Sequence, residues 1–210
     1  MLFLPHLHFE IDLWGAGLIH LAGIDEAGRG AWAGPVCAGA AVLPPDPSVA
    51  SLLNGVRDSK LMTPPQRAEW AVELKAVALA WGVGFATHIE IDEMGILPAT
   101  RLAMQRALEQ LSLWPEHLLI DAVRLPLEVP QTSLIHGDTR SLSIAAASVL
   151  AKTAHDAVML RLEKAFPGYG FGQHKGYGTG LHQDALARLG PCAVHRRSYA
   201  PVAALIPARF

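Results

Sequence analysis

The fold is organised around Ala22-Gly23-Ile24-Asp25-Glu26-Ala27-Gly28-Arg29-Gly30, an apolar segment that ends in two adjacent carboxylates and a glycine-rich turn. The apolar part predicts a strand, at whose end Asp25 and Glu26 repel each other and resist burial. Carboxylates in that position indicate a bound cation. The glycines of the turn permit backbone angles and close approaches that a side chain would block, so its N–H groups can press against a ligand.

Two more predicted strands are followed by acids. The apolar segment His117–Ile120 ends in Asp121, and Thr132–His136 is followed by Gly137 and Asp138. If the three strands are neighbours in one sheet, their four carboxylates converge. Oxygen-only ligands suit Mg²⁺ or Mn²⁺, and two such ions about 3.5 to 4 Å apart activate a water and stabilise the leaving oxygen of a phosphodiester. The pattern therefore favours a nuclease-type metal site.

Each acid also has an ordinary explanation, because a single aspartate is typically a helix cap, a solvated loop residue or half of a salt bridge. Adjacent residues of a regular strand point to opposite faces, so Asp25 and Glu26 reach one site only if the backbone bends, and the turn that begins at Ala27 can supply that bend. Another acidic pair, Asp92 and Glu93, lies near a predicted helix start, where acids favour the helix dipole and need no metal.

Alternating strand and helix patterns predict an α/β fold. Residues His20–Glu26 and Pro35–Leu43 read as a hairpin within a sheet, and Gly82–Thr87 reads as a further short strand. Apolar residues at helical spacing make 143–165 the expected central packing helix. Shorter helices are expected at about 98–111 and 181–189.

A capping box predicts one further helix. Thr63 is the expected N-cap, Pro64 occupies the first helical position, and Gln66 completes the box. The helix is expected to run to about Trp81. Its core-facing stripe is expected to be Trp70, Leu74, Val77 and Trp81.

Composition limits the class of protein. The chain has 210 residues, of which 51% are hydrophobic and 17% charged, which suits one globular domain with a small appended subdomain. The net charge of −2 gives no global basic field, so binding to nucleic acid requires local positive charge. The two cysteines, Cys37 and Cys192, are far apart and indicate neither a disulfide framework nor a zinc site.

The first 19 residues show no clean period and are interpreted as a loose N-terminal extension or a misassigned translation start. They lack the basic region of a signal peptide. The longest apolar run, residues 31–45, is interrupted by glycine and proline and is too short to span a bilayer. We therefore expect a soluble, cytoplasmic protein without a membrane partner.

The sequence offers two other candidate ligand sites, a P-loop and a zinc site made of histidines. Gly23 and Gly28 have a spacing similar to that of a P-loop, but Arg29 stands in the lysine position and Gly30 where a serine or threonine belongs. Two carboxylates inside such a loop would repel phosphate, so a nucleoside triphosphatase is the weaker alternative. Most of the ten histidines are expected to be ordinary polar or buried residues.

Local positive charge lies at turns and beside the acid-bearing strand ends, where it could bind phosphates. Each of these side chains taken alone is more often a solvated surface charge. Tyr177, between two glycines, could stack against a sugar or base. The basic residues are Arg29, Lys60, Arg140, Lys152, Lys175, Arg196 and Arg197.

Motifs along residues 21–202 resemble those of bacterial ribonuclease HII, in the order of that family. The most specific is the opening stretch from Gly23 to Gly30. The others are Ala33-Gly34-Pro35-Val36, Asp58-Ser59-Lys60, Leu119-Ile120-Asp121, Gly137-Asp138, Ile144-Ala145-Ala146-Ala147-Ser148-Val149-Leu150-Ala151-Lys152, His174-Lys175-Gly176-Tyr177-Gly178-Thr179 and His195-Arg196-Arg197-Ser198.

The resemblance implies an α/β, ribonuclease H-like fold: a mixed central β-sheet flanked by helices, with a C-terminal helical region. The domain would span 20–210, with its helical cap from about residue 167. The resemblance also implies a monomeric, metal-dependent endonuclease that cuts the RNA strand of RNA/DNA hybrids. It would also incise 5′ to a single ribonucleotide embedded in duplex DNA, leaving 3′-hydroxyl and 5′-phosphate ends.

Residue roles follow from the same resemblance. The metal ions, Mg²⁺ or Mn²⁺, would be held by Asp25, Glu26, Asp121 and Asp138. The turn of Gly28, Arg29 and Gly30 would read the 2′-hydroxyl by which a protein tells RNA from DNA, and Tyr177 would pack on the adjoining deoxyribose. Other substrate-binding residues would be Lys60, Ser148, Lys152 and Lys175.

The chain departs from the family pattern at three places. Ala122 follows Asp121 where glycine is usual, Ala31-Trp32 follows the glycine-rich turn, and His155 stands where arginine is common. The length argues against the related ribonuclease HIII, which carries a large N-terminal domain. Two rivals are a noncatalytic nucleic-acid binding module of this fold and a different two-metal nuclease or strand-transfer enzyme.

Overall fold

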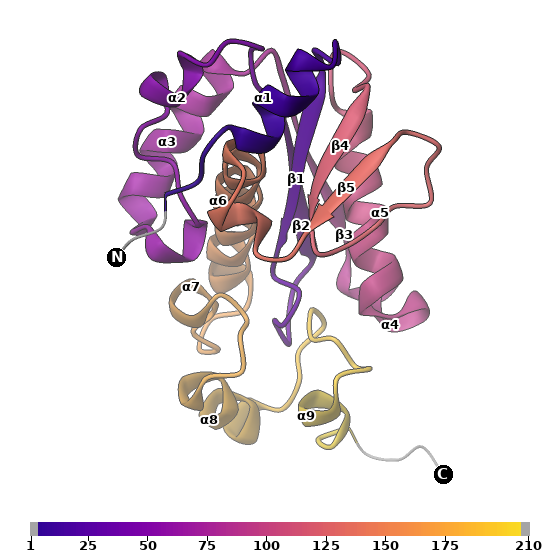
Figure 1. Ribbon diagram of the computed structural model, residues 1–210. Helices are drawn as coiled ribbons and strands as arrows, with labels where there is room; N and C mark the ends of the chain where they lie inside the picture. Colours follow the sequence, from indigo (N-terminus) through magenta and orange to yellow (C-terminus); the bar gives the residue numbers. More distant parts are fainter. Residues whose placement is uncertain (1–3, 207–210) are drawn as a thin grey trace.

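The computed structural model describes residues 4–206, which fold around one mixed sheet (Figure 1). Its strand order is β3-β2-β1-β4-β5. Strand β1 pairs antiparallel with β2 and parallel with β4, β2 pairs antiparallel with β3, and β4 pairs parallel with β5. The hairpin expected from the sequence is therefore confirmed as β1 and β2. The strands are β1 (Leu21–Ala27), β2 (Val36–Val42), β3 (Ala80–Ala86), β4 (His117–Asp121) and β5 (Gln131–Leu134).

Helices cover both faces of the sheet (Figure 1). One face packs on α5 (Ile96–Glu109), and the other packs on α6 (Leu142–Ala165), with α3 (Pro64–Val77) lying against α6. The other helical segments are α1 (His8–Gly15), α2 (Val49–Leu52), η1 (Ser59–Leu61), α4 (His88–Met94), η2 (Gly137–Thr139), α7 (Phe171–His174), α8 (Gly180–Leu189) and α9 (Ala200–Ala203).

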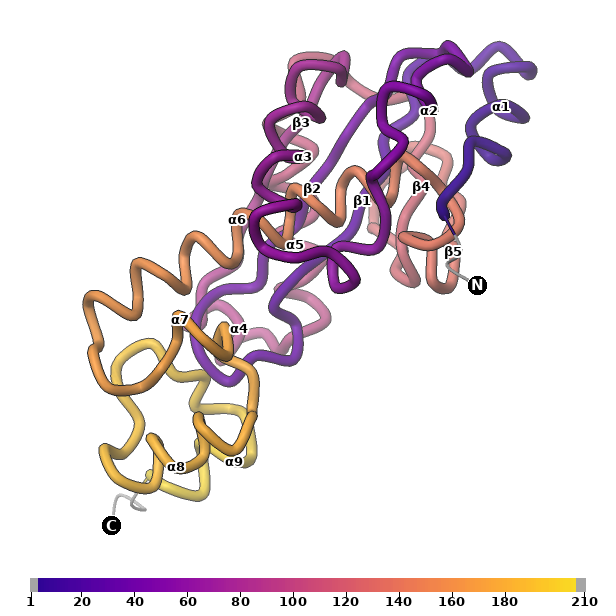
Figure 2. The backbone as a smooth tube through the Cα atoms, turned by 90° about the vertical axis from the view of Figure 1, so that its left-hand side faces the viewer, coloured from indigo at the N-terminus to yellow at the C-terminus, as the bar shows by residue number. Residues whose placement is uncertain are grey.

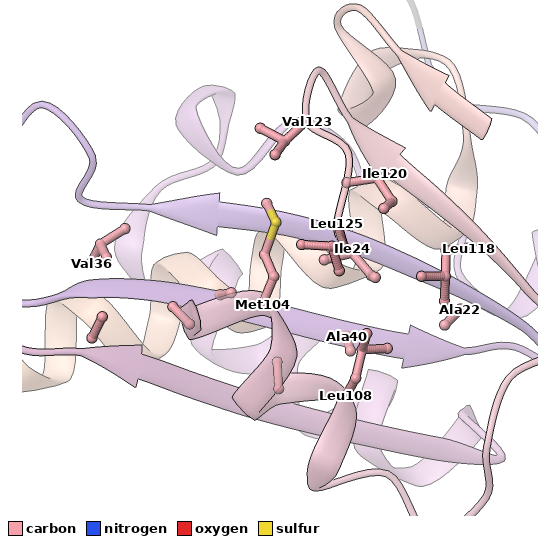
Figure 3. Packing of buried hydrophobic residues seen from close by; sticks show 14 of the residues in the cluster. Ala22, Ile24, Val36, Ala40, Met104, Leu108, Leu118, Ile120, Val123 and Leu125 are labelled. Carbon is pink, nitrogen blue, oxygen red and sulfur yellow. The ribbon is translucent and has the colours of Figure 1, made fainter. Parts of the chain in front are cut away.

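The core on the α5 side is built from alternate residues of the strands. Figure 3 shows Ile24 of β1 and Ile120 of β4 directed at Met104 and Leu108 of α5. All four side chains are buried, and burying each such side chain stabilises the fold by about 1.5 to 3 kcal/mol. Because side chains alternate along a strand, the neighbours of Ile24 in β1 face the opposite helix, α6.

Small residues let α6 lie directly on the sheet. A Cβ added at Gly23 would lie 2.1 Å from the carbonyl oxygen of Ser143, and one added at Gly39 would lie 2.3 Å from that of Ala147. No side chain fits between these backbones. The close approach brings the buried face of α6 against the end of β1, where Asp25 lies.

A helical cap follows α6. Figures 1 and 2 both show α7, α8 and α9 gathered at one end of the molecule, near the loop after β1, with α1 and α2 at the other end. The cap has its own apolar cluster, which includes Phe171, Leu186 and Val202. Isolated β-bridges join the loop after β1 to the cap, pairing Ala31 with Tyr177 and Ala33 with His195.

The capping box of α3 is confirmed, but the expected end of this helix is wrong. The Thr63 hydroxyl accepts a hydrogen bond from the Gln66 N–H, and the Gln66 Oε1 accepts one from the Thr63 N–H. The helix stops at Val77, and Trp81 lies in β3 opposite Ala41 of β2. The indole is 38% exposed, because an alternate residue of an edge strand faces solvent.

The acidic pair at 92 and 93 lies in the last turn of α4, just before α5 begins at Ile96. The Asp92 carboxylate accepts hydrogen bonds from the N–H groups of Arg197 and Ser198, both at 2.8 Å. This acid therefore anchors the segment before α9, a role that the dipole interpretation did not include. Such a contact between positions about a hundred residues apart leaves no local pattern.

Part of the predicted N-terminal extension forms α1. Its Glu10 is fully buried and accepts hydrogen bonds from the Ser141 hydroxyl at 2.6 Å and the Ser143 N–H at 2.9 Å. These groups belong to the start of α6, where a negative charge interacts favourably with the helix dipole. The looseness expected from the missing periodicity is not found in residues 4–19, and residues 1–3 lie outside the described part.

Candidate active site

A cavity of about 530 Å³ opens where β1 and β4 end. Six segments of the sequence form its walls: the end of β1 with the following turn, the segment around η1, α3, the end of β4, α6, and the loop that carries Tyr177. The lining residues are Asp25, Glu26, Ala27, Gly28, Arg29, Gly30, Ser59, Lys60, Arg67, Asp121, Lys152 and Tyr177.

Asp25 and Glu26 both line this cavity, although they are adjacent in β1. The parallel pairing of β1 with β4 stops at Ile24, and the chain then turns through Gly28, whose φ is 83°. The turn therefore begins after both acids, while β1 keeps its register with β2 through Ala27. Asp25 is 2% exposed, and its Oδ1 accepts a hydrogen bond from the Glu26 N–H at 2.7 Å.

Asp121 and Asp138 are the other two predicted metal ligands, and of these only Asp121 lines the cavity, although the charge of Asp138 acts on Asp25. Asp121 ends β4, lines the cavity and accepts a hydrogen bond from the Gly137 N–H at 2.7 Å. Asp138 lies in η2, is buried, and receives a hydrogen bond from the Lys60 ammonium at 3.3 Å. Burial raises the pKa of Asp25 well above its usual value, and the charges of Glu26, Asp121 and Asp138 raise it further.

The acids fit a hard divalent cation. Asp25 Oδ2 and Glu26 Oε2 are buried and have no hydrogen-bond donor within the described residues. A buried carboxylate oxygen without a donor is costly unless a cation or proton neutralises it. The second oxygen of each of these two carboxylates has a protein partner: Asp25 Oδ1 accepts the Glu26 N–H, and Glu26 Oε1 lies 3.6 Å from the Arg29 guanidinium. Within residues 4–206 no three acid, histidine or cysteine side chains form a ready-made ligand set. Metal binding would therefore exchange some of these partners for the ion.

Two lysines lie beside the acids. Burial alone would lower the pKa of Lys60, but the carboxylates of Asp138 and Asp58 hold it above its usual value. Lys60 is still largely exposed, so its ammonium can also reach a phosphate. On the other side of the cavity the Lys152 ammonium lies 5.5 Å from the centre of the Tyr177 ring.

Tyr177 lies against the glycine-rich turn. Its hydroxyl accepts a hydrogen bond from the Gly28 N–H at 3.2 Å. The backbone N–H of Trp32 donates to the Gly176 carbonyl at 2.7 Å, as that of any residue except proline could, whereas the contact special to tryptophan is its ring, which lies directly over Gly178. The departure at Trp32 therefore ties the turn to the loop that carries Tyr177.

The other two predicted substrate residues are not part of the cavity wall. Ser148 is buried behind Asp25, and its hydroxyl shares a hydrogen bond of 2.9 Å with that of Ser59. Lys175 has a left-handed backbone, and its ammonium donates to the Gly172 carbonyl. The structure therefore turns Lys175 toward its own loop and does not bring it to the cavity.

The sequence argument missed two residues, Asp156 and Arg67, that hold side chains of the cavity wall in place. Asp156 is a largely buried carboxylate that receives hydrogen bonds of 2.8 Å from both Lys152 and Arg67. The Arg67 guanidinium also donates to the carbonyl oxygens of Ser59 and Met62. Asp156 thus joins two walls of the cavity. The four-residue spacing from Lys152 was a visible signal for one of these ion pairs.

The departure at residue 155 has a structural consequence. The His155 ring is fully buried, and a Cβ added at Gly28 would lie 2.3 Å from its Nε2. The imidazole therefore fills the space beneath the turn. Ala122, the other departure beside an acid, has a φ of 50°, a region in which glycine is relaxed and alanine is strained.

Comparisons with known proteins agree with this geometry. The family model described as ribonuclease HII matches residues 22–202. A ribonuclease HII from Chloroflexus aurantiacus is 52% identical over 203 residues, covering 95% of each chain. One from Thermus thermophilus is 49% identical over 201 residues, covering 96% of this chain and 95% of its own. Among solved structures, ribonuclease H2 from Pyrococcus horikoshii matches with a TM-score of 0.73 at 25% identity, covering 89% of this chain and 97% of that chain.

A mixed five-stranded sheet with flanking helices and acids at the ends of β1 and β4 defines a nuclease of the ribonuclease H-like class. The chain belongs to the ribonuclease HII family. It is a hydrolase, an endonuclease that acts on the RNA strand of RNA/DNA hybrids and removes ribonucleotides, and its family is metal-dependent. Within residues 4–206 no helix is long and apolar enough to cross a membrane.

Proposed function

We propose that this chain incises duplex DNA 5′ to an embedded ribonucleotide, with Asp25, Glu26, Asp121 and Asp138 as ligands for two Mg²⁺ or Mn²⁺ ions. The observation that carries the proposal is the pair of buried, donor-free oxygens, Asp25 Oδ2 and Glu26 Oε2. When bound, the ions supply an activated water and charge stabilisation for the leaving 3′-oxygen. A structure of the related ribonuclease HIII is described as a complex with Mn²⁺.

The chain's own residues would bind and orient the substrate. In this proposal Lys60 and Lys152, on two walls of the cavity, bind the phosphates on either side of the cut. Tyr177 presents its ring edge to the sugar on the deoxyribose side of the junction. The turn at residues 28–30 contacts the ribose, whose 2′-hydroxyl is the feature that distinguishes it from deoxyribose.

The test is cleavage-site mapping on a DNA duplex that contains one ribonucleotide, with Mg²⁺ and Mn²⁺ in turn. We expect one product with a 3′-hydroxyl end immediately 5′ to the ribonucleotide, and no product in EDTA. The key variant is Asp121→Asn, because the amide oxygen can still accept the Gly137 N–H while the charge is lost. Its activity should fall at least about a hundredfold at unchanged melting temperature.

A matched control is Asp46→Asn, which removes an exposed carboxylate that also accepts a backbone N–H, from Ser48. This variant should retain full activity. Full activity of Asp121→Asn would overturn the metal-site assignment. Binding without cleavage under either metal would favour a noncatalytic module, and cleavage of all-DNA duplex would favour a different nuclease of this fold.

We also propose that the enzyme acts as a monomer in the cytoplasm. A single chain supplies the acids Asp25, Glu26 and Asp121 together with Lys60, Lys152 and Tyr177 to one cavity, which supports the monomer as the active form. Light scattering of the purified protein should give the mass of a single chain, 22.5 kDa. A stable dimer that loses activity on dissociation would contradict this.

A further inference from the structure

A buried arginine from the C-terminal cap holds the glycine-rich turn. Arg196 is 0% exposed, although a guanidinium is always charged and is strongly solvated when it can be. Its five N–H groups all donate to oxygen atoms, four of which are carbonyls of the segment 28–35. The acceptors are the carbonyls of Gly28 at 2.7 Å, Arg29 at 2.9 Å, Gly34 at 2.9 Å and Pro35 at 2.9 Å, and the Tyr199 hydroxyl at 3.0 Å.

Tyr199 adds one more hydrogen bond to the carbonyls that Arg196 holds. Its hydroxyl donates to the Arg29 carbonyl at 2.7 Å, while its ring lies 5.2 Å from the Arg196 guanidinium carbon. The Arg29 carbonyl therefore receives two donors, and the Gly28 carbonyl receives Arg196 and the Ala31 N–H. Both carbonyls therefore point toward donors inside the protein. Rotation of either peptide group would break two hydrogen bonds and is unfavourable.

The direction of these carbonyls determines the direction of two N–H groups. A trans peptide is planar, so its N–H points opposite to its C=O. The carbonyl of Gly28 shares a peptide with the N–H of Arg29, and that of Arg29 shares one with the N–H of Gly30. Neither N–H has an acceptor within the part of the chain that the structure describes. Both residues are exposed and line the cavity, and each N–H points away from the carbonyl that Arg196 holds.

We propose that Arg196, with Tyr199, is a positioning residue for ribose recognition: it orients the N–H groups of Arg29 and Gly30 toward the 2′-hydroxyl without touching the substrate. The inference rests on the proposed contact between this turn and the ribose. It explains the geometry of the turn by a side chain that lies more than 160 residues later in the sequence. The 2′-oxygen accepts from these donors, whereas a deoxyribose has no atom there to accept them.

The test is a ratio of affinities, measured in EDTA so that no strand is cut. Two duplexes of the same sequence are compared, one all DNA and one with a single ribonucleotide. Arg196→Lys replaces five fixed donors by at most three, so it cannot hold four carbonyls. Tyr199→Phe keeps the ring and removes one donor to the Arg29 carbonyl. Losing one aligned hydrogen bond weakens binding roughly fivefold.

We expect the ribose preference to fall about tenfold in Arg196→Lys and about threefold in Tyr199→Phe, with all-DNA affinity changed less than about twofold. The matched control is Arg197→Lys, which changes the adjacent exposed arginine and should leave the preference unchanged. If Arg196→Lys does not fold, Tyr199→Phe carries the test.

The outcomes separate two errors. If the wild-type protein binds the two duplexes equally well, the proposed role of the turn is wrong, and so is this inference. A wild-type preference that persists in both variants, or a weakening that is equal for the two duplexes and accompanied by a lower melting temperature, would overturn the role of Arg196 alone.

Discussion

Replacing Asp156 with asparagine should lower both the stability of the protein and its affinity for substrate. The carboxylate is largely buried and accepts hydrogen bonds of 2.8 Å from Arg67 and Lys152. Asparagine keeps one acceptor but turns an amide N–H₂ toward the second cation. Removing one partner of a buried ionic group costs about 3 to 5 kcal/mol, because a charge is left without compensation.

The magnitude can be read as a shift in melting temperature. For a chain of this size each kcal/mol corresponds to about 2 to 4 °C, so a loss of about 3 kcal/mol lowers the melting temperature by roughly 6 to 12 °C. The pKa of Asp156 is low despite the opposing effect of burial, because His155, Lys152 and Arg67 stabilise the anion. A depressed pKa contributes stability above the unfolded value of about 3.9, which is lost as the pH falls below it. The wild type should therefore lose stability as the pH falls, and Asp156→Asn should lose less over the same pH range.

Kinetics separate the positioning effect from the structural one. Without the Asp156 carboxylate, the Lys152 ammonium is no longer held in place. KM should then rise about three- to tenfold with little change in kcat, because the contact with substrate is weakened equally in the ground state and the transition state. In a Lys152→Met background the same substitution should no longer raise KM. The matched control is Glu90→Gln, which loses a carboxylate paired with Arg106 far from the cavity. Equal KM increases from Asp156→Asn in both backgrounds, or an unchanged melting temperature, would refute the reasoning.

Three further outcomes are expected. Gly28→Ala should reduce activity and destabilise the fold by about 2 to 4 kcal/mol, measured by urea unfolding, since a Cβ at a φ of 83° is strained and meets the His155 ring; a neutral effect would contradict the packing beneath the turn. Glu10→Ala should lower the melting temperature by several degrees through loss of the buried contacts to α6, and an unchanged value would mean that α1 is dispensable. Burial lowers the pKa of His182 and of His195 to about 4, so their stabilisation is complete above about pH 6.5 and is lost as the pH falls toward 4; melting temperatures that stay flat from pH 7 to 4.5 would refute it.

Much of the site could be predicted because its chemistry is local in the sequence. Asp25 and Glu26 stand at the end of an apolar strand, and Asp121 ends another, so strand patterning alone indicated where carboxylates gather. The capping box at Thr63 was visible for the same reason, since a cap involves residues only three positions apart. The resemblance to ribonuclease HII rested on these same stretches.

Where the structure goes beyond or against the expectation from the sequence, contacts between distant segments outweigh the local preference of the residues. Trp81 continues a helical stripe in the sequence, yet it lies in β3 because backbone pairing with β2 outweighs helix propensity. The Asp92 carboxylate binds backbone N–H groups far along the chain. The sequence also did not indicate the position of Lys175, whose ammonium donates to the carbonyl of Gly172.

By itself, the sequence determined which acids end the strands, where the glycine-rich turn begins and which family the chain resembles, because periodicity and turn chemistry act over a few residues. Only the tertiary structure decided how that turn is held. The orientation of the Arg29 and Gly30 N–H groups depends on Arg196, and the position of Lys152 depends on an ion pair that reaches Arg67. A buried charge takes whichever partners folding brings within hydrogen-bond distance, and no local pattern records that choice.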